Sequence, residues 1–399
     1  MKQRLSTLSL MATAALTASN AVAGTLVAPP SPGKNPVADS KPLDPCEKFW
    51  AWATLHKDDS NPFLQEFALI GRYQAQYALA DRSGAGDGDA DNLDNRRVRM
   101  GFRAKALKDF EVKMEAFADP NAGDIYAGLA EAYVAWKPDD AFNLTVGKHK
   151  PRFSLDWTTS SREIVTIERN IMINNLGLDF ATGASVSGKQ GKLSYFAGSF
   201  NNETLAADGM DEWGDLDGGW SYTGSLAYDV SAFTGTEKAS ARIDYLHSEG
   251  DGDQLIRHDD ALAVSLALKQ GAWGLNSELL YAERSAPVAG GDGDMLGFYL
   301  MPTYDFSKRL QLVMRYTHAE SDGAGIQAQS RYERLGGSLG GGPVGPTVGD
   351  SYDALYLGLN YYICGHKLKL MSGVEWAELG AAAGGVETWT LVSGVRLFF

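Results

Sequence analysis

The sequence predicts an all-β fold, a transmembrane antiparallel β-barrel of about sixteen strands with short periplasmic turns and one long loop folded inward. Three observations carry this prediction. Segments in which apolar and polar residues alternate recur from Phe67 to the end of the chain. The connections between these segments are short and long in turn, and the chain begins with an export signal. A soluble β-sandwich does not require this alternation of short and long connections.

Residues 1–23 have the three parts of a secretory signal peptide. Lys2 and Arg4 give the positive start, Leu5–Ala18 is the apolar run, and the A-x-A site at 21–23 predicts cleavage after Ala23. The apolar run is too short to span a membrane as an anchor helix. We therefore expect an exported protein, located in the outer membrane of a Gram-negative-type bacterium.

Residues 24–62 are predicted to form a periplasmic linker that is rich in proline and ends in a short aromatic segment. Phe49, Trp50 and Trp52 of that segment either lie in a short helix or pack on the rim of the barrel, and we favour packing. Cys46 and Cys364 both fall on the periplasmic side of the predicted topology. Since exported proteins form disulfides, these two residues are a candidate pair.

The barrel is predicted over residues 63–399, with residues 150–176 as a constriction loop. The expected strands are 67–81, 95–107, 109–119, 127–137, 142–149, 177–187, 191–200, 220–230, 238–249, 260–270, 272–284, 295–305, 309–319, 352–363, 366–378 and 386–399. In the last of these, Trp389 and Leu391 share one face, while Thr388, Thr390 and Arg396 share the other. This alternation, and a final aromatic residue, are typical of outer-membrane strands.

The formal net charge is −14, and −16 once Lys2 and Arg4 leave with the signal peptide, which argues against nucleic acid as a partner. Much of the acid lies in expected loops, at Asp87–Asp94, Asp208–Asp217, Asp251–Asp260 and Asp292–Asp294. Such loops are either simply solvated or hold divalent cations that bridge lipopolysaccharide.

The hairpin Arg96–Phe117 places Arg97, Arg99, Arg103 and Lys105 on one face and apolar residues on the other. The opposite register would put these cations in lipid at about 2–4 kcal/mol each near the midplane, so we expect them to line the lumen. Arginine stays charged and offers paired donors to phosphate or carboxylate, and a row of weak sites lets an anion move along. Alternatively, Glu111 and Glu115 pair with Arg99 and Arg103 and brace the wall.

The segment after the strand at 142–149 is also rich in cations. We expect it to fold into the mouth of the barrel and to contain a helix over Arg162–Met172, because Ile164, Ile167 and Ile171 have helical spacing. Its candidate pore-lining cations are Lys148, Lys150, Arg152, Arg162 and Arg169. Pairing with Asp156, Glu163 and Glu168 is the competing expectation.

Two stretches together resemble the phosphate-selective porin O and P family: RRVRMGFRAKALKDFEVKMEAF (Arg96–Phe117) and TVGKHKPRFSLDWTTSSREIVTIERN (Thr145–Asn170). The first resembles that family's arginine-rich hairpin with a Lys-Asp-Phe turn, and the second its TVG-x-x-K strand end and the Glu-Arg of its constriction loop. The resemblance is clear over Gly71–Phe200 and implies a trimeric channel of about sixteen strands. It also implies that Arg97, Arg99 and Arg103 belong to an arginine ladder. Lys148, Lys150 and Arg152 would then begin the inward loop.

No catalytic set is visible in the sequence. Ser160 and Ser161 have no evident base, and the histidines show no metal-ligand spacing, so we expect no enzyme, metal or cofactor. The predicted function is an outer-membrane porin for passive diffusion of small hydrophilic solutes, biased to anions such as phosphate. Expected partners are outer-membrane lipid, lipopolysaccharide, small anions and further copies in a homotrimer. The alternatives are a plugged barrel that serves as an adhesin or scaffold, and a non-selective general porin.

Overall fold

The computed structural model describes residues 44–202, 213, 219–249, 256–284, 293–328, 332 and 347–399 of the chain. The chain divides into two units, Met1–Asp44 and Pro45–Phe399, and every helix and strand below belongs to the second. The predicted signal peptide at 1–23 and residues 24–43 of the predicted linker lie outside the described residues.

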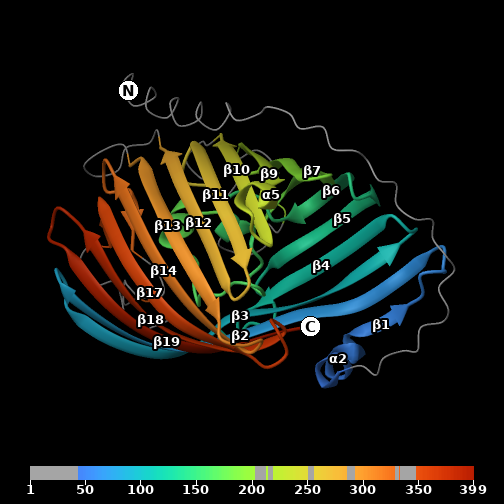
Figure 1. The fold of residues 1–399 in the computed structure, drawn as a ribbon, viewed down its shortest axis with the longest axis horizontal. Coiled ribbons are helices and arrows are strands. Elements are labelled where there is room, and N and C mark those ends of the chain that lie inside the picture. Colours follow the sequence, from blue (N-terminus) through green and yellow to red (C-terminus); the bar gives the residue numbers. More distant parts are fainter. Residues whose placement is uncertain are drawn as a thin grey trace. The chain divides into compact units, whose positions relative to one another are not determined.

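Sixteen strands form one closed antiparallel ring in chain order (Figure 1). They are β2 (Leu64–Gly84), β3 (Gly88–Ala106), β4 (Phe110–Ala118), β5 (Leu129–Asp139), β6 (Phe142–His149), β7 (Ala181–Gln190), β8 (Leu193–Asn201), β9 (Trp220–Asp229), β10 (Lys238–Ser248), β11 (Asp260–Gln270), β12 (Trp273–Glu283), β13 (Met295–Asp305), β14 (Leu310–Ser321), β17 (Ser351–Tyr362), β18 (Leu368–Gly380) and β19 (Val386–Phe398). Pairing of β19 with β2, from Val386 opposite Gly84 to Phe398 opposite Arg72, closes the ring. The predicted barrel and its strand number are confirmed.

The remaining elements are short: α2 (Pro45–Trp50), η1 (Ala51–Ala53), β1 (Thr54–Lys57), α3 (Leu155–Thr158), α4 (Ile171–Leu176), α5 (Ser231–Thr234), β15 (Ile326–Gln327) and β16 (Val348–Gly349). Strand β1 pairs with β2, and β15 pairs with β16 in a separate hairpin. Within the part of the chain that is described, no helix is long and apolar enough to cross a membrane.

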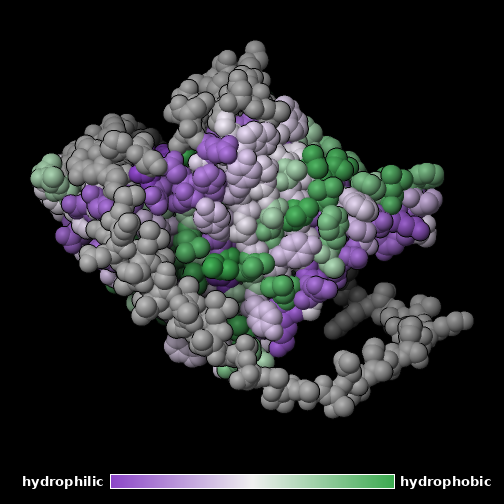
Figure 2. All heavy atoms as spheres, turned by 90° about the horizontal axis from the view of Figure 1, so that it is seen from above, coloured by the Kyte–Doolittle hydropathy of each residue, from purple (hydrophilic) through white to green (hydrophobic). Residues whose placement is uncertain are grey.

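Exposure alternates along the strands, as a barrel with an apolar outer face requires. In β19, Trp389 is 51% exposed while Thr388 is 4% exposed, so the predicted faces of this strand are correct. In β17, Leu355, Leu357 and Leu359 are exposed. Most of the large hydrophobic side chains that are exposed belong to leucine, tyrosine or tryptophan. Figure 2 shows hydrophobic side chains gathered in patches on the surface. The outer face is therefore suited to hydrocarbon.

The first hairpin is longer than predicted. Residues 88–94 of the acidic segment, expected to form a loop, belong to β3, where Asp91 accepts a hydrogen bond from the Tyr77 hydroxyl at 2.9 Å. Ala78 and Ala80, in the part of β2 that pairs with this stretch of β3, are buried. Other residues therefore cover the inner face of the wall here. Asp208–Asp217, apart from residue 213, and residues 251–255 of Asp251–Asp260 lie outside the described residues.

The helix predicted over Arg162–Met172 is wrong for most of its length, because α4 begins only at Ile171. Strand side chains take the carbonyl groups that a helix would use. Lys369 donates to the Ile164 carbonyl at 2.5 Å, and Asn360 to the Val165 carbonyl at 2.8 Å. The isoleucine spacing therefore reflects burial against successive strands rather than helical packing.

The N-terminal segment is attached to the end of the barrel where the chain finishes. Cys46 and Cys364 form a disulfide with a Cα–Cα distance of 5.6 Å. The indole nitrogen of Trp50 donates to the Phe398 carbonyl at 2.5 Å, and the ring of Trp52 lies 4.8 Å from that of Phe399. The aromatic segment is thus helical in part and also packs on the rim.

Candidate channel interior

Residues 150–176, which connect β6 to β7, are held by side chains on the buried face of the strands. On one side, Arg72 and Gln74 of β2 donate to the hydroxyl and the carbonyl of Ser161. On the opposite side of the ring, Glu278 of β12 accepts hydrogen bonds from the Ser154 hydroxyl at 2.6 Å and the Leu155 amide at 2.5 Å. Two points in the first half of the segment are therefore fixed by charged or amide side chains of the wall.

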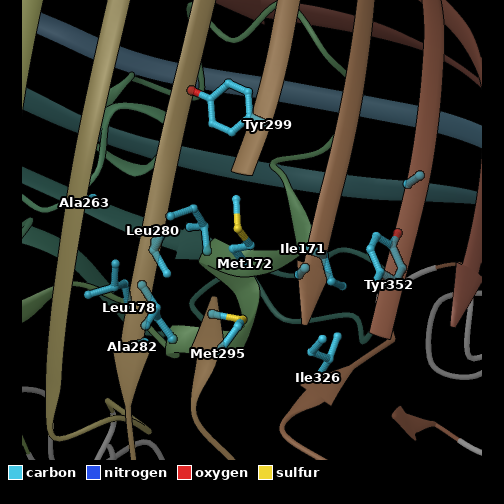
Figure 3. Close-up of a cluster of buried hydrophobic side chains, with 14 of the residues drawn as sticks. Ile171, Met172, Leu178, Ala263, Leu280, Ala282, Met295, Tyr299, Ile326 and Tyr352 are labelled. Carbon is cyan, nitrogen blue, oxygen red and sulfur yellow. The ribbon is translucent and has the colours of Figure 1, made fainter. Parts of the chain in front are cut away.

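Helix α4 packs into an apolar sector of the interior (Figure 3). Met172 and Leu176 are fully buried, and the same cluster contains Leu280 of β12, Met295 and Tyr299 of β13. Figure 3 shows Leu280 and Met295 beside the helix that carries Met172, while Tyr299 lies farther from it. By contrast, β3 to β7 place charged and hydroxyl side chains on their buried face, including Arg99, Glu115, Thr145, Ser185 and Ser187.

Two buried carboxylates each receive several cations. Around Glu115, nitrogen–oxygen distances are 3.2 Å to Arg72, 3.8 Å to Arg99, 3.9 Å to Lys113 and 3.3 Å to Arg162. Lys113 also contacts Glu131. Around Glu168, the distances are 2.5 Å to Arg96 and 3.8 Å to Arg97. Six cations thus share three carboxylates, which leaves an excess of positive charge.

The predicted row on β3 divides into two groups. Arg97 lies near Glu168 and donates to Gln74 at 2.9 Å, whereas Arg99 lies near Glu115. Arg103 and Lys105, with side chains 40% and 48% exposed, instead face Glu66 at 2.6 Å and 3.8 Å. Of the bracing contacts expected from Glu111 and Glu115, the one between Glu115 and Arg99 is present. Arg103 pairs with Glu66 instead, because the β3–β4 register sets Arg103 opposite Lys113.

Glu111 lies instead 3.4 Å from Lys137. It also accepts a hydrogen bond from the Tyr133 hydroxyl at 3.0 Å. This carboxylate therefore braces the β4–β5 pair rather than the β3 row.

The cations of the segment after β6 differ in their surroundings. Arg169 lies 3.7 Å from Asp156 and donates to the Thr159 carbonyl at 2.7 Å. Lys148 is 1% exposed although Val146, which shares its alternation, is 52% exposed, because Gly147 has a φ of 121° that breaks the alternation.

Lys150 and Arg152 contact aromatic rings. Lys150 donates to the Trp157 carbonyl and lies 4.1 Å from the ring of Trp157, while the exposed Arg152 lies 5.1 Å from the ring of Phe196. Among the described residues, neither has a carboxylate within 4.0 Å. Burial, together with Arg169 and Arg99, lowers the pKa of Lys150 well below its ordinary value.

Several interior cations were not selected from the sequence: Arg72, Arg82, Arg96, Arg315, Lys369 and Arg396. Arg315, for example, lies 3.0 Å from Glu375 and donates to the Glu168 carbonyl at 2.9 Å. The sequence does contain a signal for such residues, because a lone cation between apolar neighbours in a barrel strand must face inward to avoid lipid. The bulge between β2 and β3 explains Arg96, because an extra residue there turns two successive arginines toward Glu168.

Comparisons with known proteins identify a matching family and solved structures of similar fold. The family model described as phosphate-selective porin O and P matches residues 67–377. An anion-selective porin from Comamonas acidovorans has 13% identity and a TM-score of 0.59, with 84% of this chain and 99% of that chain covered. OmpF of Salmonella typhi has 12% identity and a TM-score of 0.57, with 87% and 100% covered.

OprB of Pseudomonas putida has 10% identity and a TM-score of 0.59, with 84% of this chain and 94% of that chain covered. At these identities the structural likeness concerns the fold alone. A search of the curated proteins finds no match.

Proposed function

The chain belongs to the phosphate-selective porin O and P family, and we propose from this premise that it forms a water-filled channel through the outer membrane that passes small anions, such as phosphate, in preference to cations. The observation that carries the preference is the charge excess around Glu115 and Glu168, where six cations share three carboxylates. Cations that are fixed in a narrow lumen raise the local concentration of anions and lower that of cations.

In this proposal, residues 150–176 constrict the channel. Support comes from the apolar packing of α4 against β12 and β13, which occupies one sector of the interior. The remaining path then borders β3 to β7, where the charged side chains lie. Anions that cross the barrel would therefore pass Arg99, Lys150 and Arg152.

The proposal also includes export by the signal peptide at 1–23 and assembly as a homotrimer. The family resemblance supports the trimer. Native mass spectrometry of detergent-extracted protein tests it, because a mass of one chain only would contradict this part.

Planar bilayers test the anion preference. In a KCl gradient, we expect the reversal potential to have the sign that results when chloride is more permeant than potassium. We also expect added phosphate to reduce the chloride current. Replacing Arg72, Arg99 and Arg162 by glutamine removes three of the excess charges and should lower the anion-to-cation permeability ratio.

The matched control is Arg242→Gln with Asp244→Asn. This buried pair, 2.5 Å apart, contributes no net charge, so its loss should leave the ratio unchanged. A wild-type reversal potential near zero would instead indicate a general porin, and a barrel without measurable single-channel current would indicate a plugged scaffold.

A further inference from the structure

We propose that aromatic rings hold in place three of the cations that confer anion selectivity, namely Arg99, Lys150 and Arg152. The inference rests on the proposed channel function. Arg99 lies on β3, and Lys150 and Arg152 follow β6, in the part of the ring that contributes nothing to the apolar cluster of α4. Each of the three lies over at least one ring.

Arg99 contacts two rings. Its guanidinium carbon lies 4.2 Å from the ring centre of Phe117 on β4 and 4.8 Å from that of Phe180, which follows α4. The two rings are 6.1 Å apart in an edge-to-face arrangement. The carboxylate of Glu115 is 3.8 Å away and also contacts three other cations, so Arg99 receives only a share of its negative charge.

The rings form a continuous support. Trp157, which lies under Lys150 at 4.1 Å, is 6.5 Å from Phe180, and its ring also contacts Arg169 at 5.3 Å. We call Phe117, Phe180 and Trp157 the aromatic row. A second support, Phe196, lies 5.1 Å from Arg152 and stacks on Phe200.

The physical distinction is between holding a cation and cancelling its charge. A carboxylate such as Glu66 fixes Arg103 in place but removes its net field. The face of an aromatic ring attracts a cation through its quadrupole and carries no net charge, so the cation is held and its field remains. An un-neutralised, pre-oriented guanidinium is what a permeating anion can use.

The test removes the rings and leaves every charge in place. We compare Phe117→Leu with Phe180→Leu as a double variant, and Phe196→Leu alone, in planar bilayers. We expect the anion-to-cation permeability ratio to fall by about two- to five-fold, because the cations lose the ring contacts that hold them at the lumen. Replacement by tyrosine, which keeps the ring, should restore the ratio.

Phe102→Leu is the matched control, because Phe102 stacks on Phe67 at 5.6 Å and the cations of its strand, Arg99 and Arg103, take the other face. Folding is checked by heat-modifiable mobility on gels. If the wild type selects anions and the folded leucine variants keep the same ratio, the inference is overturned while the proposed function stands. If the wild type shows no anion preference, the proposed function itself fails.

Discussion

Replacing Glu115 by glutamine should increase anion selectivity and decrease stability at the same time. Glu115 is 0% exposed and lies 3.2–3.9 Å from four cations. The substitution keeps the size and an acceptor oxygen but removes the one negative charge that these cations share. If the cluster only stabilised the barrel wall, the substitution would lower stability without increasing anion selectivity.

The stability loss follows from the pair distances. At an effective dielectric constant of about 20, each contact contributes about 4–5 kcal/mol of Coulomb attraction, largely offset by desolvation and by repulsion among the cations. Removal of one partner from such a buried network costs about 3–5 kcal/mol. We therefore expect Glu115→Gln to unfold at lower urea concentration.

The gain in selectivity can be estimated separately. One added positive charge about 8 Å from the ion path, in water, favours an anion and disfavours a cation by about 0.5 kcal/mol each. Screening at 0.1 M salt leaves roughly half of this difference, which corresponds to about a two-fold rise in the permeability ratio.

Reversal potentials of wild type and Glu115→Gln in KCl gradients measure this rise. The difference should be present near 0.1 M and largely absent near 1 M, where the Debye length is about 3 Å. A folded Glu115→Gln channel with an unchanged or smaller ratio at low salt would refute the assignment of these cations to ion selection.

Three further predictions concern other parts of the molecule. The Cys46–Cys364 disulfide closes a loop with a sequence separation of 318, so its reduction should lower the free energy of unfolding by up to about 5 kcal/mol, seen as a lower urea midpoint. A Cys46→Ser variant should already have the lower midpoint and should not respond to the reductant. The pKa of Lys150 is lowered by burial and by Arg169 and Arg99, against Glu131, which raises it. Its charge is therefore lost on raising the pH through that lowered pKa, and the anion preference should fall in the wild type more than in Lys150→Arg. Met172→Ala should destabilise the packing of α4 by about 2–5 kcal/mol and increase current noise, whereas the exposed Met114→Ala should not.

The fold could be predicted because lipid imposes one rule on every strand. Outward residues must be apolar, so the two-residue period appears in strands as different as β9 and β19. The boundaries of β2 and β3 could not be predicted as well, since exposed residues there include the acidic Asp89 and Asp91 rather than apolar residues only. Outside the membrane, the alternation of apolar and polar residues no longer indicates which face of a strand is buried.

The interior could be predicted only in part. The lipid rule predicts an inward face for Arg97 and Arg99, and in the structure these two residues lie near Glu168 and Glu115. The lipid rule does not identify the carboxylates that contact these arginines. Those contacts depend on the strand register, which the sequence does not give. Glu168 is the clearest case, since it comes from the segment after β6 and meets Arg96 across the interior.

The apolar sector of the interior has its own sequence signal, which follows from the same rule. In β13, Leu296 and Leu300 are exposed outward, while Met295, Tyr299 and Met301 are buried inward, so the strand is apolar on both faces. A water-filled lumen gives no reason for an apolar inner face, and such a strand therefore requires a part of the chain to cover it from inside. In this protein that cover is α4. In the proposed channel, the open path then lies toward β3 to β7, and a permeating anion meets the cations of these strands and of residues 150–176.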